Sequence, residues 1–140
     1  MAEETLVKEP LTDSMKRGGE ELTRKLDEAN WPVVASFWYF VREHNRWSLI
    51  LASPKVLSDG PKASYAAVNR TLSALRDHFA NLESITVVPP THDLVRTLAS
   101  AFPTASGSAV SGTRFSNNSI NGHFIDDAYL YRITTNTAAA

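Results

Sequence analysis

The chain has 140 residues and a mass of 15.4 kDa, which suits one compact domain with a buried core. Its 14 Lys and Arg residues nearly balance 15 Asp and Glu residues, so the formal net charge is −1. A nucleic-acid interaction would therefore need a local basic patch, because bulk charge does not supply one. The absence of cysteine excludes disulfides, thiolate metal sites and cysteine nucleophiles.

The first residues are acidic and polar, without the basic segment and apolar run of a signal peptide. We expect a flexible N-terminal arm over residues 1–11, a single domain over 12–134 and a frayed tail over 135–140. No apolar stretch approaches the roughly 20 residues that cross a bilayer. The sequence therefore indicates a soluble, cytoplasmic protein with no membrane partner.

Residues 12–30 predict a helix, with Asp13 as the candidate N-cap. The pair Gly18-Gly19 lies inside this helix and costs about 1 kcal/mol per glycine relative to alanine. Either the helix breaks there, or a neighbouring backbone comes close. A β-hairpin then turns at His44-Asn45. Its first strand is apolar on both faces, so helices, a second copy or a partner should cover both.

A second helix is expected from Pro61, after a cap at Ser58 or Asp59. Its buried stripe is spaced at three and four residues and comprises Tyr65, Val68, Leu72, Leu75, Phe79 and Leu82. A short strand over 85–88 and a third helix follow, then a flexible Ser/Ala/Gly loop over 104–112 and two further strands that turn at Asn121-Gly122. This order, α-β-β-α-β-α-β-β, predicts an α+β fold: a single-layer mixed or antiparallel sheet with helices mainly on one face.

The hairpin carries the leading candidate site, which comprises Trp38, Phe40, Arg42 and Trp47. Aromatic residues and arginine are enriched at the centres of protein interfaces. The same residue types stack single-stranded bases in nucleic-acid-binding sheets, although the net charge does not support that partner. A third interpretation is that the tryptophans are plain core residues.

Two further groups are candidates for chemistry. His123, Asp126 and Asp127 are the densest set of metal-ligating or acid–base residues, and they would suit a small metal-dependent hydrolase or nuclease. A His and a carboxylate three residues apart point to opposite faces of a regular strand, however. Thr91, His92 and Asp93 open a helix after a strand, where free N–H groups can hold an anion. The alternative there is structural, with Thr91 as the cap and Asp93 complementing the helix dipole.

The leading hypothesis is a non-catalytic protein-interaction module that acts through the Trp-rich hairpin, by self-association as a homodimer or by docking to a larger protein. Its partner would be another protein chain. An enzyme is not favoured, because the residues form no convincing catalytic set, and we expect no cofactor and no metal. The metal-dependent hydrolase is the first alternative, and single-stranded nucleic-acid binding is the second.

Overall fold

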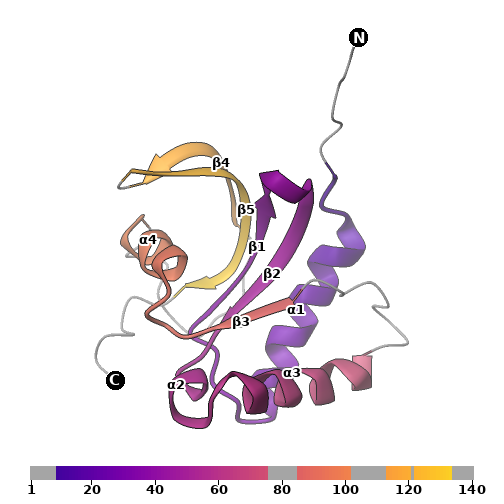
Figure 1. The fold of residues 1–140 in the computed structure, drawn as a ribbon. Coiled ribbons are helices and arrows are strands. Elements are labelled where there is room, and N and C mark those ends of the chain that lie inside the picture. The colour runs from indigo at the N-terminus through magenta and orange to yellow at the C-terminus, as the bar shows by residue number, and fades with distance from the viewer. Residues whose placement is uncertain (1–8, 76–84, 102–112, 121, 134–140) are drawn as a thin grey trace.

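The computed structural model describes residues 9–75, 85–101, 113–120 and 122–133, and it confirms the α+β class (Figure 1). The elements follow the expected chain order, and a five-residue helix is added in front of the second long helix. In sequence they are α1 (Asp13–Glu28), β1 (Ala35–Val41), the 3₁₀ turn η1 (Arg42–His44), β2 (Arg46–Ala52), α2 (Lys55–Asp59), α3 (Pro61–Leu75), β3 (Ile85–Val88), α4 (Asp93–Ala101), β4 (Thr113–Ile120) and β5 (His123–Ile133).

The five strands form one mixed sheet in the order β3-β2-β1-β5-β4. The central strand β1 pairs antiparallel with both β2 and β5, and β4 completes an outer hairpin with β5. Only β3 is parallel to its neighbour, β2. Asn45 closes the β1–β2 hairpin in a left-handed conformation (φ 48°), which asparagine tolerates better than most residues. The β4–β5 hairpin curls around α4 (Figure 1).

Both faces of the sheet are covered by the helices of this chain. Helices α1 and α3 lie over one face, and α4 lies over the other (Figure 1). The first core contains Trp38, Phe40, Trp47, Leu49, Leu51, Leu22, Leu26 and Val68. The second contains Phe37, Ile50, Leu130, Ile133, Val95 and Leu98. The first strand of the hairpin is apolar on both faces because β1 is the centre of this sandwich, and α4 provides the cover that a partner would otherwise have to supply.

Helix α1 runs through the glycine pair without a break. Thr12, rather than Asp13, is its N-cap: the Thr12 hydroxyl oxygen accepts the N–H of Met15 at 3.1 Å. A Cβ atom on Gly19 would lie 2.5 Å from the Tyr131 hydroxyl oxygen and 2.8 Å from Trp38 Nε1. Two large side chains of the sheet therefore approach the helix here, in place of the neighbouring backbone that the sequence suggested.

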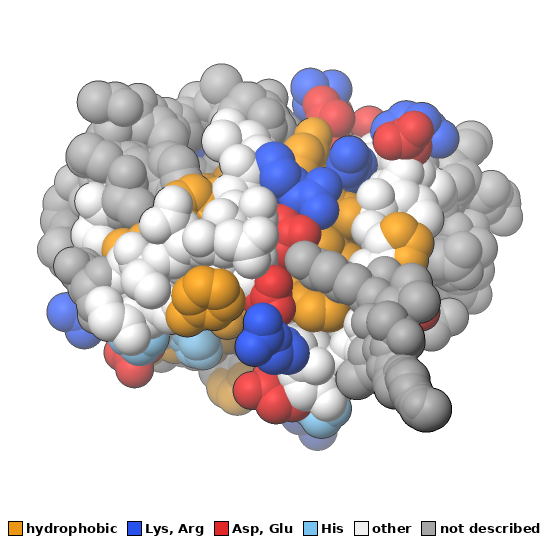
Figure 2. Space-filling view, turned by 90° about the horizontal axis from the view of Figure 1, so that it is seen from above, with side chains coloured by type: hydrophobic (Ala, Val, Ile, Leu, Met, Phe, Trp, Pro, Cys, Tyr) orange, Lys and Arg blue, Asp and Glu red, His pale blue; other side chains and the backbone are white. Residues whose placement is uncertain are grey.

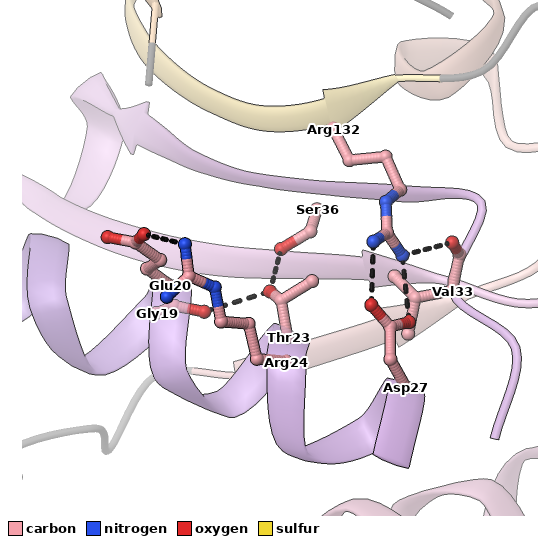
Figure 3. A network of polar contacts seen from close by, with 8 residues as sticks. All are labelled: Gly19, Glu20, Thr23, Arg24, Asp27, Val33, Ser36 and Arg132. Atoms are coloured by element: carbon pink, nitrogen blue, oxygen red, sulfur yellow. Dashed lines mark hydrogen bonds and ion pairs between the residues drawn. The ribbon is translucent and has the colours of Figure 1, made fainter. Parts of the chain in front are cut away.

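Polar contacts fasten the remaining length of α1 to the sheet (Figure 3). The Thr23 and Ser36 hydroxyl oxygens lie 2.7 Å apart, and both residues are buried. Near the end of the helix the Arg132 guanidinium donates to both carboxylate oxygens of Asp27, at 3.0 and 2.7 Å, and to the carbonyl oxygen of Val33 at 3.0 Å. This bidentate pair joins α1 to β5 and to the segment entering β1.

The last three residues of the expected N-terminal arm lie against the hairpin. Trp47 Nε1 donates to the Glu9 carbonyl oxygen at 2.7 Å, the Glu9 N–H donates to the Asn45 side-chain oxygen at 3.0 Å, and Leu11 is buried. The predicted tail, the loop over 104–112 and the stripe residues Phe79 and Leu82 lie outside the described residues. Within the described part, no helix is both long enough and apolar enough to cross a membrane.

Candidate functional site

The first half of β5 brings together residues from two of the candidate groups, the acidic cluster and the hairpin contact set. Arg42, next to the hairpin turn, donates through Nε to Asp126 Oδ2 at 2.9 Å. Arg114 on β4 donates through Nε and Nη2 to the two carboxylate oxygens of Asp127, at 2.6 and 2.7 Å. Each aspartate of the predicted acidic cluster is therefore held by an arginine. One of these arginines belongs to the predicted contact set.

This arrangement does not favour a metal centre. Asp126 and Asp127 are consecutive residues of a strand, so their side chains point in opposite directions and bind different arginines. His123 is exposed at the start of the same strand. Across the residues that the structure describes, no group of three or more His, Cys, Asp and Glu side chains could hold a metal ion.

Arg42, Arg114 and a third cation, Lys16 on α1, each lie over an aromatic ring. The Arg42 guanidinium carbon is 5.9 Å from the Phe124 ring centroid, and that of Arg114 is 5.4 Å from the Trp47 ring. Lys16 Nζ is 5.2 Å from the Tyr129 ring centroid. These distances fall within the range of cation–π attraction.

We call this set of side chains the charged line; it comprises Lys16, Arg114, Asp127, Asp126 and Arg42. Figure 2 shows basic and acidic side chains following one another across the middle of this face, with hydrophobic side chains on either side.

The electrostatics of the line favour fixed charges. The hydrogen bond that Arg114 donates to Asp127 raises the pKa of Arg114 above its ordinary value, against an opposing effect of burial. Burial is the first cause that raises the pKa of Tyr39, and the nearby carboxylates of Glu43 and Asp126 add to it. Arg114 therefore stays cationic and Tyr39 stays neutral at physiological pH. Neither shift produces a group that exchanges protons near neutrality, as a general acid or base must.

The structure places three of the four predicted contact residues in the core. Trp38, Phe40 and Trp47 are only 1%, 4% and 3% exposed, whereas the Arg42 side chain is 72% exposed. In this fold the three rings are thus unavailable as a contact surface, and the core interpretation of the tryptophans is the one that fits. Their density in the sequence reflects their position in the two central strands of a sheet covered on both faces.

Sequence reasoning missed Phe124, Arg114, Tyr129 and Lys16. Phe124 is 51% exposed and is the second residue of β5, two positions after Gly122, and this place near the start of a strand is the signal that could have drawn attention to it. The other three are scattered over α1, β4 and β5. The β4–β5 register pairs Arg114 with Tyr129, and the packing of α1 brings Lys16 to the Tyr129 ring.

The predicted anion site lies at the start of α4, where Thr91, His92 and Asp93 are all exposed. His92, rather than Thr91, meets the first turn: its ring Nδ1 accepts the N–H of Leu94 at 3.2 Å. One of the free N–H groups expected for an anion is therefore already bound within the chain.

No protein-family model, curated protein or solved structure matches this chain. The charged line offers two carboxylates that are each paired with an arginine, and the exposed ring of Phe124 lies beside Arg42 at one end of it.

Proposed function

We propose that this chain is a non-catalytic protein-interaction module that acts by self-association or by docking to a larger protein. The observation that carries the proposal is the exposed ring of Phe124, which the exposed guanidinium of Arg42 contacts on one face. Phe124 is one of three large hydrophobic side chains that are exposed in the described part of the chain. Aromatic rings and arginines are the side chains that most often dominate binding energy at protein interfaces.

The contact pair is arranged before any partner arrives. Asp126 accepts a hydrogen bond from Arg42 Nε at 2.9 Å and so holds the guanidinium beside the ring. Ordering a long side chain on binding costs about 0.5–1.5 kcal/mol, and this restraint removes part of that cost. Phe124 also projects from the outermost hairpin of the sheet, where a second protein can reach it.

The pairing of both aspartates supports contact over metal-dependent hydrolysis. A carboxylate that accepts hydrogen bonds from a guanidinium does not offer those lone pairs to a divalent cation. Asp127 accepts two such bonds from Arg114.

A photocrosslinking experiment tests the proposal. Benzoylphenylalanine replaces Phe124 in the full chain, which is expressed in its own host and irradiated, and the adducts are identified by mass spectrometry. The matched control carries the same residue at Leu57, another exposed hydrophobic position, on α2. We expect one dominant adduct from position 124 and none from position 57, and Arg42→Ala should weaken it.

The mass of the adduct separates the two modes of action. Twice the chain mass indicates self-association, and a different protein indicates docking. Equal crosslinking from both positions, or no adduct from position 124, would remove Phe124 as a contact residue and the proposal with it.

A further inference from the structure

The other end of the charged line is a cluster of polar donors from three separate elements. Tyr129 on β5 is paired with Arg114 on β4, so their side chains are neighbours on one face of the sheet. Lys16 reaches them from the first turn of α1, with its Nζ 5.2 Å from the Tyr129 ring centroid. The ammonium, the phenol and the guanidinium are thus gathered at one place on the surface.

This cluster carries an uncompensated positive charge. Lys16 contacts the Tyr129 ring but has no carboxylate partner in the described part of the chain, because Glu20, one turn further along α1, pairs with Arg24 at 2.7 Å. The single acid of the cluster, Asp127, is matched by Arg114. Two cations and one carboxylate leave a local surplus of one positive charge.

Hydrogen-bond donors are also left over. A guanidinium has five N–H groups, and two N–H groups of Arg114 bind Asp127. The half-exposed side chain of Arg114 presents the others to solvent. Within the described residues, neither the Tyr129 hydroxyl nor Lys16 Nζ makes a hydrogen bond.

We infer that Lys16, Arg114 and Tyr129 form a surface site for a phosphate group. A tetrahedral oxyanion can accept from an ammonium, a guanidinium and a phenol at once, and it supplies the negative charge that the cluster lacks. The aromatic rings beneath the cations exclude water from one side, which strengthens the electrostatic attraction. The inference does not depend on the contact role of Phe124, which lies at the opposite end of the line.

The test is an NMR titration of the full chain with inorganic phosphate at constant ionic strength. We expect saturable shifts at the Lys16 and Tyr129 amides and at the side-chain N–H groups of Arg114. Lys16→Gln should weaken phosphate binding about tenfold, the usual effect of losing one charge-assisted hydrogen bond. Lys16→Arg should keep most of the affinity, and Tyr129→Phe should show the smaller loss of a neutral donor.

The matched control is Lys62→Gln, which removes an exposed positive charge from α3. Equal weakening by this variant would mean that phosphate responds only to overall charge, which overturns the site. Acetate that binds as well as phosphate, or the absence of saturable shifts at these residues, overturns it too. If phosphate binds as expected, comparison with phosphoserine and ribose phosphate distinguishes free phosphate from a phosphate ester as the natural source.

Discussion

Replacing Gly19 with alanine would test whether the close contact between α1 and the sheet organises this fold. In an ordinary helix interior the change is favourable by about 0.5–1 kcal/mol, because glycine loses more backbone entropy on folding. Here the added methyl group would meet the Tyr131 hydroxyl at 2.5 Å and Trp38 Nε1 at 2.8 Å. Both groups are buried and hydrogen-bonded, so neither can move aside without breaking a bond.

The size of the effect follows from the contacts that must give way. Overpacking a core by one methyl group costs about 1–3 kcal/mol. Trp38 Nε1 donates to the Tyr131 hydroxyl at 2.9 Å, and that hydroxyl donates to the Lys16 carbonyl oxygen. Leaving such a buried group unsatisfied costs about 1–3 kcal/mol more. After the favourable helix term is subtracted, we expect a net destabilisation of about 1–5 kcal/mol.

Urea unfolding followed by far-UV circular dichroism and tryptophan fluorescence measures this free energy. Ser14→Ala, at an exposed position of the same helix, is the control and should change stability by at most about 0.5 kcal/mol. In a Tyr131→Phe background the clashing oxygen is absent, so Gly19→Ala should cost less there. If Gly19→Ala is as stable as the parent chain or more stable, the contact does not constrain α1 and the reasoning fails.

Three further predictions concern buried polar groups. Asp27→Ala should lower the free energy of unfolding by about 3 kcal/mol, because it leaves the charge of Arg132 on a side chain that is only 4% exposed. Arg132→Met should cost less, because the Asp27 side chain that it leaves behind is 40% exposed and can be hydrated. Urea unfolding that gives the reverse order would contradict this. Burial is the main cause that raises the pKa of Tyr131 above its ordinary value of 10.0, so the folded chain keeps a proton that the unfolded chain loses. The stability that Tyr131 contributes should therefore be fully present below pH 10 and should fall at higher pH by up to about 1.4 kcal/mol per pH unit. Thermal unfolding measured against pH should show a smaller loss of stability above pH 10 for Tyr131→Phe than for the parent chain. An equal loss in the two chains would refute the role of Tyr131. The buried Ser64 hydroxyl has no hydrogen-bond partner among the described residues, so Ser64→Ala should raise the free energy of unfolding by about 1 kcal/mol. A loss of stability in urea unfolding would contradict this.

Local patterns were sufficient to predict most of the secondary structure. The turn at His44-Asn45, the helix start at Pro61 and the strand over 85–88 all appear in the structure, because each has a local cause in turn chemistry or side-chain periodicity. Helix α2 was missed because five residues are too few to show a helical period. The N-cap was misplaced by one residue, since Thr12 and Asp13 are both good caps and only the hydrogen bond to Met15 distinguishes them.

The site was harder to predict because it depends on contacts distant in sequence. Arg42 and Asp126 are 84 positions apart, and nothing short of the strand order places them together. Whether the tryptophans are core or surface also depends on distant elements: Leu11 and α1 complete the core around Trp38 and Trp47. The glycine pair predicted either a break in the first helix or a close contact with a neighbouring segment. It could not indicate that the contacting residue would be Tyr131, which is more than 100 positions away in the sequence.

Strand β5 contributes Tyr131 to the core and Tyr129 to the proposed phosphate site, so a change in the core can affect phosphate binding. Its Tyr131 hydroxyl donates to the carbonyl oxygen of Lys16, the residue whose ammonium group reaches the ring of Tyr129. A change that displaces α1 from Tyr131 must therefore move Lys16 as well. Gly19→Ala should therefore weaken phosphate binding although it replaces none of the three proposed phosphate ligands. Arg42 is held by Asp126 at the other end of the charged line, so its contact with the Phe124 ring should be unchanged. The two surfaces are thus separable: a perturbation of α1 acts on one and spares the other.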